Sequence, residues 1–160
     1  MKNIINKRFL IQGIIGVTLY VLISMFHLSL IYILIAGSMI GVVFGKAFCR
    51  WICPIGFIME LMFKESEDRR KQQMYMYYKA GCPIAWISGF LNKYSIFKIK
   101  KDTNTCISCG KCDRVCYITS LNPDFSLYKD EKMDPAKNYK CSKCLECVKE
   151  CPVNSLKVGI

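Results

Sequence analysis

Residues 106–116 read Cys-Ile-Ser-Cys-Gly-Lys-Cys-Asp-Arg-Val-Cys, and residues 141–152 read Cys-Ser-Lys-Cys-Leu-Glu-Cys-Val-Lys-Glu-Cys-Pro. Both follow the pattern Cys-x2-Cys-x2-Cys-x3-Cys, which takes up eight of the eleven cysteines in the chain of 160 residues. Three cysteines at every third position can wrap one turn of backbone around one iron-sulfur cube. The two runs therefore predict two [4Fe-4S] clusters, and with them a function in electron transfer.

The ligand sets follow from the same spacing, which is that of bacterial ferredoxins with two clusters. In this spacing the fourth cysteine of each run binds the other cluster. One predicted set is Cys106, Cys109, Cys112 and Cys151, and the other is Cys141, Cys144, Cys147 and Cys116. Each cluster would then join both runs, so we expect neither run to fold alone without iron.

Zinc and disulfides are the two alternatives for these cysteines. Structural zinc sites normally use two separated cysteine pairs and stop at four ligands, so two complete four-cysteine runs exceed that need. Disulfide frameworks suit small secreted domains in oxidising compartments, and nothing in the sequence supports secretion. Iron-sulfur clusters are the preferred interpretation.

The two runs belong to an internal repeat with an offset of 35 residues, because residues 116–121 align with residues 151–156. Leu145 stands where the first run has Gly110. Residues 117–140 form a longer and more charged connection than a minimal ferredoxin needs, and Pro123 and Pro135 mark it as a surface loop. It is either a docking loop or a simple insertion.

The other end of the chain is apolar. Residues 9–44 are 36 residues without a formal charge. As one helix they would extend about 54 Å, well beyond a hydrocarbon core of about 30 Å. The run must therefore fold back, and the polar break at His27, Leu28 and Ser29 predicts the turn between two spans of about 17 to 18 residues.

Cations flank this apolar run on both sides, at Lys2, Lys7, Arg8, Lys46 and Arg50, and none lies at the predicted turn. The distribution predicts that both chain termini are cytoplasmic. A cleaved signal peptide is the alternative, but the apolar run is too long for one. His27 invites a haem interpretation, although a polar residue at the membrane surface is the simpler one.

A second repeat, with an offset of 29 residues, follows the apolar run: residues 53–64 align with residues 82–93. Pro54 and Pro83 each suit the first turn of a helix. At about 12 residues each, the two helices are too short to span and are expected at the membrane face. Trp51, Trp86 and the tyrosines of residues 75–78 are expected at headgroup depth, and residues 64–71 in water.

Three cysteines remain outside the ferredoxin runs, Cys49, Cys53 and Cys82. Cys49 and Cys53 form a Cys-x3-Cys-Pro motif, and a spacing of four on one helix would place them on one face. In the second copy Tyr78 stands in place of the first cysteine. The three thiols form either an extra redox or metal site or a set of small buried apolar side chains.

The stretch Gly-Lys-Ala-Phe-Cys-Arg-Trp-Ile-Cys-Pro-Ile-Gly at residues 45–56, together with the run at residues 106–116, resembles the NapH-type membrane ferredoxins, which are related to the NosR and CcoG proteins. The resemblance covers nearly the whole chain. It implies transmembrane helices, Cys-x3-Cys-Pro motifs and paired four-cysteine runs on the cytoplasmic side. Many members have four or more spans, whereas two are expected here, and the second Cys-Pro motif lacks its first cysteine.

The expected fold is α+β, with a two-helix transmembrane anchor and interfacial helices followed by a bacterial 2[4Fe-4S] ferredoxin-like domain. Residues 1–48 would form the transmembrane hairpin, residues 49–95 the pair of Cys-Pro interfacial helices, and residues 96–160 the ferredoxin domain. The protein is expected in the cell membrane, with both termini and the ferredoxin domain cytoplasmic.

The expected function is a membrane-anchored relay of single electrons between a membrane-associated donor and a redox partner. The alternative is a redox-dependent maturation or metal-handling factor that uses Cys49, Cys53 and Cys82. The sequence has no Gly-rich dinucleotide loop, no histidine besides His27 and no carboxylate constellation, which favours an electron-transfer subunit over a stand-alone enzyme.

The charge indicates the partners. The formal net charge is +11, and two oxidised clusters at about −2 each would leave about +7. A basic protein close to a membrane is expected to bind the lipid bilayer and a membrane or soluble redox partner with an acidic surface. A quinone is a further candidate partner, and no nucleic-acid module is present.

Overall fold

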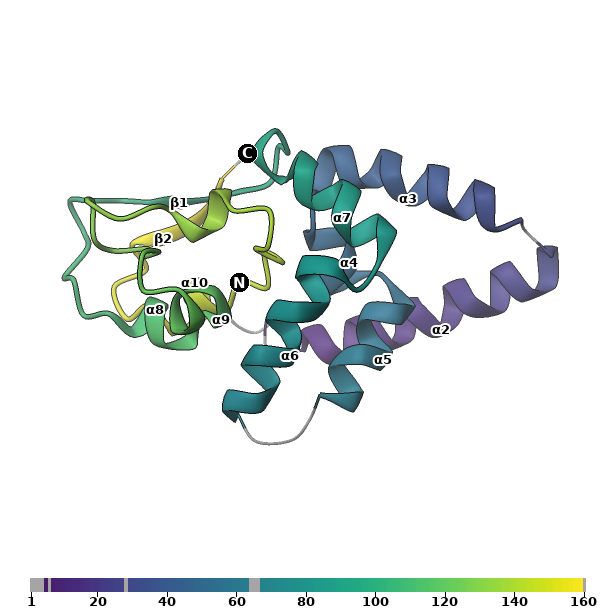
Figure 1. Cartoon of the computed structure of the whole chain (residues 1–160), viewed down its shortest axis with the longest axis horizontal. Helices are drawn as coiled ribbons and strands as arrows, with labels where there is room; N and C mark the ends of the chain where they lie inside the picture. The colour runs from purple at the N-terminus through teal and green to yellow at the C-terminus, as the bar shows by residue number, and fades with distance from the viewer. Residues whose placement is uncertain (1–4, 6, 28, 64–66, 160) are drawn as a thin grey trace.

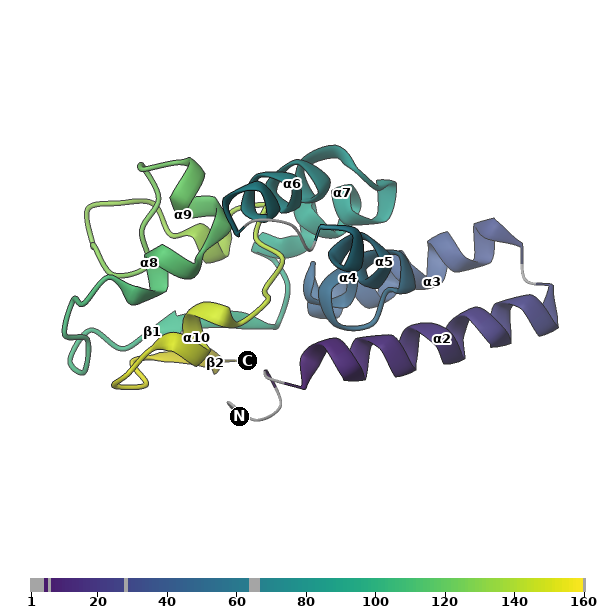
Figure 2. The same ribbon diagram turned by 90° about the horizontal axis from the view of Figure 1, so that it is seen from below.

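The computed structural model describes residues 5, 7–27, 29–63 and 67–159. Three parts follow one another along the long axis of the molecule, as Figure 1 shows. A helical hairpin lies at one end, four short helices lie in the middle, and the two cysteine runs lie at the other end with a small sheet. Figure 2 shows the same order from a perpendicular direction.

The hairpin consists of α2 (Arg8–Phe26) and α3 (Leu30–Phe44). His27 ends α2 in the left-handed conformation, with φ 45°, so the predicted turn between two helices is confirmed, although Leu28 lies outside the described residues. Within the described part of the chain, α2 is the one helix long and apolar enough to cross a membrane, since α3 has 15 residues. The expected two-helix anchor is therefore supported for one helix only.

The middle part contains α4 (Ala47–Trp51), α5 (Pro54–Met62), α6 (Glu67–Ala80), α7 (Pro83–Phe90) and the 3-10 turn η1 (Leu91–Lys93). Pro54 and Pro83 each begin a helix, as the repeat predicts. The predicted boundary between residues 48 and 49 falls inside α4, and the division into three domains stays a prediction.

Each Cys-Pro helix packs against one helix of the hairpin, α5 against α2 and α7 against α3. Glycines allow the close approach. A Cβ atom on Gly16 would lie 3.2 Å from Pro54 Cα, and one on Gly41 would lie 3.2 Å from Ser88 Cβ. The 29-residue repeat is therefore also a repeat in packing, with one copy for each hairpin helix.

The expected placement of Tyr77 and Tyr78 at headgroup depth is wrong for the segment between the two Cys-Pro helices, whereas its residues 67–70 are exposed, as expected for a charged stretch in water. Most of this segment is the 14-residue helix α6, which contacts α7 and α9, and Tyr77 and Tyr78 are buried in its packing rather than placed on an outer surface. Met74, Tyr77 and Tyr78 have the spacing i, i+3, i+4 of an apolar helix face, and this signal could have been found in the sequence.

Trp51 is also half-buried, and its Nε1 donates to Lys143 O at 3.2 Å.

The last part contains strands β1 (Lys98–Lys101) and β2 (Leu156–Gly159), which pair antiparallel with Lys98 opposite Gly159. Its helices are α8 (Lys111–Val115), α9 (Tyr117–Leu121) and α10 (Glu146–Glu150), with the 3-10 turn η2 (Pro135–Lys137). Helices α8 and α10 begin and end 35 residues apart, which confirms the repeat in three dimensions. The observed fold is thus mainly helical with one small sheet.

Candidate functional site

The eight cysteines of the two runs line two separate pockets. The first pocket, here site A, is lined by Cys106, Cys109, Cys112 and Cys151, together with Tyr128 and Leu127. The second, site B, is lined by Cys116, Cys141, Cys144 and Cys147, together with Tyr117, Glu146 and Leu127. The pockets group the thiols into the two sets that the ferredoxin spacing predicts, whereas iron ligation itself stays a prediction.

The thiols line these pockets without gathering at one point. Among the residues that the structure describes, no three histidine, cysteine or carboxylate side chains form a group that could hold a single metal ion. None of the eleven cysteines forms a disulfide.

The backbone around both sites repeats a conformation that suits an anionic group. Ser108 and Gly110 at site A have φ of 52° and 70°, and Lys143 and Leu145 at site B have φ of 50° and 64°. Left-handed residues within such short runs form concave nests of N–H groups, and iron-sulfur sites commonly use them. Leu145 adopts a conformation that costs a residue with a side chain about 1–2 kcal/mol, so site B tolerates strain that Gly110 avoids at site A.

Burial raises the pKa of four of the thiols at these sites, Cys112, Cys116, Cys141 and Cys147, and so favours their protonated form. It raises the pKa of Cys112 and of Cys141 to about 12, and the pKa of Cys147 well above its usual value. At Cys151 burial also raises the pKa, but hydrogen bonds from Ser155 and from the backbone near Leu156 outweigh it, and the pKa is lowered. Because iron binds thiolates, loading the sites must displace protons.

Two buried lysines lie beside site B without a carboxylate partner. Lys46 and Lys143 are 0% and 1% exposed, and within the described part of the chain neither forms a salt bridge. The Nζ of Lys46 donates to Tyr78 O, and the Nζ of Lys143 donates to Ser95 Oγ and to Phe97 O.

These lysines fit a negatively charged group at site B. Burial lowers the pKa of Lys46 and of Lys143 to about 8, and both side chains interact electrostatically with the Cys141 thiol. Buried charges in proteins are normally paired with a charge of opposite sign. A cluster held by four thiolates carries about −2, so it would supply the missing counter-charge.

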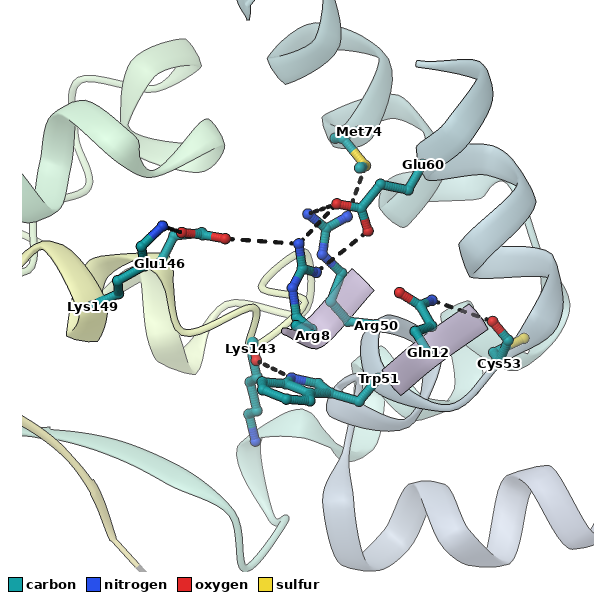
Figure 3. A network of polar contacts seen from close by, with 10 residues as sticks. All are labelled: Arg8, Gln12, Arg50, Trp51, Cys53, Glu60, Met74, Lys143, Glu146 and Lys149. Atoms are coloured by element: carbon teal, nitrogen blue, oxygen red, sulfur yellow. Dashed lines mark hydrogen bonds and ion pairs between the residues drawn. The ribbon is translucent and has the colours of Figure 1, made fainter. Parts of the chain in front are cut away.

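Buried ion pairs connect site B to the base of the hairpin, as Figure 3 shows. Glu60 of α5 accepts from Arg8 Nη2 at 2.8 Å, and its Oε1 lies 3.0 Å from Arg50 Nη2. Arg8 Nη2 also lies 3.7 Å from Glu146 Oε1 on α10, which lines site B. The sequence analysis used Arg8, Lys46 and Arg50 only as cations flanking the membrane, but the structure buries all three at this junction.

The three remaining cysteines interact electrostatically as a group of three, although within the described residues they do not form a group that could hold a single metal ion. Cys49 and Cys53 are buried, and each of them interacts electrostatically with Cys82. The expectation that Cys49 and Cys53 share one face of one helix is wrong, because the helix breaks: Cys49 lies in α4 and Cys53 caps α5. Burial raises the pKa of Cys49 to about 12, and its Sγ lies 3.6 Å from Ser88 Oγ.

Two stacked tyrosines bridge site B and this group of three thiols. The rings of Tyr78 and Tyr117 have centroids 6.1 Å apart and planes inclined by 27°. Tyr117 lines site B and interacts with Cys141, and Tyr78 interacts with Cys49. The sequence marked Tyr78 only as the residue in place of a cysteine, and it gave neither tyrosine a role at the site.

Comparison with known proteins supports an iron-sulfur protein. A model of a 4Fe-4S binding domain family matches residues 10–72, which include the hairpin, Cys49 and Cys53. These findings support a 4Fe-4S ferredoxin-like protein. The matched region is less than half of the chain and precedes both four-cysteine runs.

Three relatives are similar to this chain. The uncharacterized proteins MJ0749 and MJ0750 of Methanocaldococcus jannaschii are 21% and 22% identical to it; the matches cover 76% and 95% of this chain and 68% and 83% of the relatives. YccM of Escherichia coli K12, named as an electron transport protein, is 32% identical over 46% of this chain. The chain spans 18% of the length of YccM. No solved structure matches the chain.

Proposed function

We propose that this protein is a NapH-type, membrane-anchored carrier that holds two [4Fe-4S] clusters and relays single electrons between a membrane-associated donor and a redox partner. The observation that carries the proposal is the pair of pockets, each lined by four thiols drawn from both cysteine runs. When bound, each cluster accepts and releases one electron. The 4Fe-4S family match and the similarity to YccM support the same role.

The protein supplies a short route between the two clusters. Leu127 lines both pockets, so the two sites are neighbours that share this side chain. Beyond site B, Tyr117 and Tyr78 continue toward Cys49 and the hairpin. The arrangement suits a relay that runs along the axis of the molecule, from site A at one end toward the membrane at the other.

The exposed apolar surface of the hairpin supports the membrane anchor. Leu10, Ile14 and Val17 on α2 are each 61% exposed, and Met39 on α3 is 69% exposed. Soluble proteins rarely leave contiguous apolar patches of this kind in water. On the Cys-Pro helices Ile58, Met62, Trp86 and Phe90 are also exposed, as expected for helices at the membrane face.

The hairpin base supports the proposed orientation. Arg8 begins α2, and Lys46 and Arg50 follow the end of α3, so these cations lie at the end of the hairpin opposite the turn at His27. Figure 1 shows that this end of the hairpin faces the part of the molecule that contains β1, β2, α8 and α10. The side of a membrane protein that is rich in lysine and arginine is normally cytoplasmic. We therefore infer that both clusters and both termini face the cytoplasm, where thiolates stay reduced.

Iron and sulfide analysis of the full chain in detergent tests the proposal. Two clusters require about eight iron and eight sulfide per chain, and the reduced protein should show electron paramagnetic resonance signals from two clusters. Cys144→Ser and Cys109→Ser should each alter one signal and leave the other. A folded preparation that is colourless and free of iron, or one that stays in solution without detergent, contradicts the proposal.

The partner proposal rests on charge. The formal net charge of +11 favours an acidic surface on a membrane or soluble redox partner, and a quinone is the alternative acceptor at the membrane. Raising the salt concentration should slow electron exchange with an acidic protein partner, because salt screens attraction between charged surfaces. If the rate of electron exchange does not change with salt concentration, the proposal of an acidic partner surface is wrong.

A second candidate function is metal handling or redox-dependent maturation at Cys49, Cys53 and Cys82. The observation that favours it is the grouping of these three thiols, two of which lie in the region matched by the 4Fe-4S family. The substitution Cys53→Ala separates the two functions. A relay should keep its cluster content and its reduction rate, whereas a metal-handling factor should lose its activity.

A further inference from the structure

We propose that Lys46 and Lys143 are the counter-ions of the cluster at site B and raise its reduction potential above that of the cluster at site A, so that electrons pass from A to B. This inference rests on the proposed function, and it gives the relay a direction. It follows from a difference in the charges that surround two sites with the same ligand spacing.

The surroundings of site B are cationic. Lys143 acts on the Cys141 thiol, Lys46 acts on the Cys49 thiol and, less strongly, on the Cys141 thiol, and Arg50 acts on Glu60 and, less strongly, on the Cys144 thiol. Two carboxylates lie at the same junction. Glu60 forms ion pairs with Arg8 and Arg50, and Glu146 forms an ion pair with Arg8. Lys149 also pairs with Glu146, so the cations at this junction outnumber the carboxylates among the described residues, and Lys46 and Lys143 form no salt bridge there.

The surroundings of site A have no such excess. Asp113 lies beside Cys112 and acts on it as a negative charge, and its Oδ1 accepts from Leu127 N at 2.8 Å. The lysine that lines site A, Lys101, forms a salt bridge with Asp130. A carboxylate next to a cluster opposes the arrival of an electron, whereas a buried cation favours it.

Hydrogen bonding to the ligands does not distinguish the sites. The sulfur of Cys151 at site A receives hydrogen bonds from the Ser155 side chain and nearby backbone, and the sulfur of Cys116 at site B receives them from the Thr119 side chain and nearby backbone. These hydrogen bonds stabilise the sulfur of each ligand in the same way, so the difference between the two sites lies in the surrounding charges.

Exposure to water has the opposite effect on the order of the two reduction potentials, because it favours reduction at site A. Cys109 at site A is exposed, whereas the thiols at site B are half-buried or buried. Water stabilises the added negative charge of a reduced cluster, which favours site A. Buried lysines oppose this more strongly, because a charge interacts further and with less screening inside a protein than at its surface. We therefore expect the lysines to determine the order.

The transfer step is balanced within the protein. One electron leaves the reduced cluster at site A, which returns to its oxidised state, and enters the oxidised cluster at site B, which becomes reduced. Exposure of Cys109 makes site A the entry point for an external one-electron carrier. Site B lies at the hairpin base, so the electron comes to rest on the membrane side.

A redox titration followed by electron paramagnetic resonance tests the order of the two potentials in the full chain, with both clusters bound and in detergent. Cys109→Ser and Cys144→Ser assign the two signals to site A and site B. We expect site B to be reduced first, with a preference of at least tenfold, which corresponds to about 59 mV for one electron. Equal midpoints, or prior reduction of site A, overturn the proposal.

Substitutions identify the cause of the difference. Lys46→Met should lower the midpoint of site B and reduce the preference severalfold, whereas Lys46→Arg should preserve it. Lys101→Met is the matched control, and its effect should be confined to site A. An unchanged site B midpoint in Lys46→Met contradicts the proposal, as does an equal shift at both sites.

The two levels of inference fail in different ways. An iron content below two clusters per chain removes the proposed function itself. If two clusters are present but site A has the higher reduction potential, the proposed function still holds, and only the proposed direction of electron transfer from A to B is wrong. If Lys46→Met does not fold, the assigned order in the unmodified protein still decides the question.

Discussion

Sites A and B have the same ligand spacing but different surroundings. Site A is built from the last part of the chain, and Cys109 reaches solvent. Site B meets α4 and the hairpin base through Lys46, Arg50 and Trp51. The comparison teaches that the spacing of cysteines defines a ligand set, whereas residues far away in the sequence determine its charge, its burial and its neighbours.

The largest expected effect is a difference in unfolding free energy between a variant without the cluster at site B and a variant without the cluster at site A. Cys147→Ser should remove the cluster at site B and leave Lys46 and Lys143 buried without a counter-charge. Leaving a buried charge unpaired typically costs about 3–5 kcal/mol. Cys109→Ser should remove the cluster at site A without that cost. Iron content and thermal unfolding of both variants check this, and an equal loss of stability in the two would contradict the difference between the sites.

The ion pairs at site B provide the next prediction. Glu60→Gln leaves Arg8 and Arg50 without their shared carboxylate, whose side chain is 10% exposed. We expect a loss of about 3–5 kcal/mol in unfolding free energy, because two buried guanidinium groups lose their partner. Chemical denaturation measures this loss. A change below about 1 kcal/mol would show that the junction is open to water.

The backbone at the two sites gives a smaller effect. Gly110 at site A has φ of 70°, so Gly110→Ala should lower the unfolding free energy by about 1–2 kcal/mol. Leu145 already carries such strain at the equivalent position of site B. Denaturation of the variant, compared with Ser108→Ala as a control at another left-handed residue, checks the assignment. If Gly110→Ala leaves the unfolding free energy unchanged, the backbone at residue 110 can leave the left-handed conformation without cost.

The smallest effect is expected at the surface of site A. Asp130 pairs with Lys101, but its side chain is 78% exposed. Exposed salt bridges contribute about 0–1 kcal/mol, so Asp130→Asn should leave the unfolding free energy almost unchanged, in contrast to Glu60→Gln. A large loss of stability at Asp130 would show that the two sites are protected from water to a similar degree.

Local sequence signals predicted the features that depend on neighbouring residues. The polar break near His27, the helix starts at Pro54 and Pro83, and the grouping of the cysteines were all read from spacing and residue type. For the turn and the two helix starts the determining residues lie within a few positions of one another, so elementary chain geometry applies directly, whereas the grouping of the cysteines was read from the spacing typical of ferredoxins with two clusters.

The features that the sequence did not reveal depend on contacts between distant residues. Lys46 donates to Tyr78, 32 residues away, and Lys143 donates to Ser95, 48 residues away. A lysine next to an apolar run is normally a membrane-flanking cation, and nothing local distinguishes one that is buried. Helix α6 was missed for another reason: its charged first turns concealed the apolar face formed by Met74, Tyr77 and Tyr78.

The central claim is that this chain holds two clusters in neighbouring sites, which share Leu127 as a lining residue. Electron paramagnetic resonance of the fully reduced protein tests it most directly. We predict a spectrum broadened by magnetic interaction between two one-electron-reduced clusters, which simplifies to a single unperturbed signal in both Cys109→Ser and Cys144→Ser. A single narrow signal in the unmodified protein, unchanged by one of these substitutions, would contradict the account.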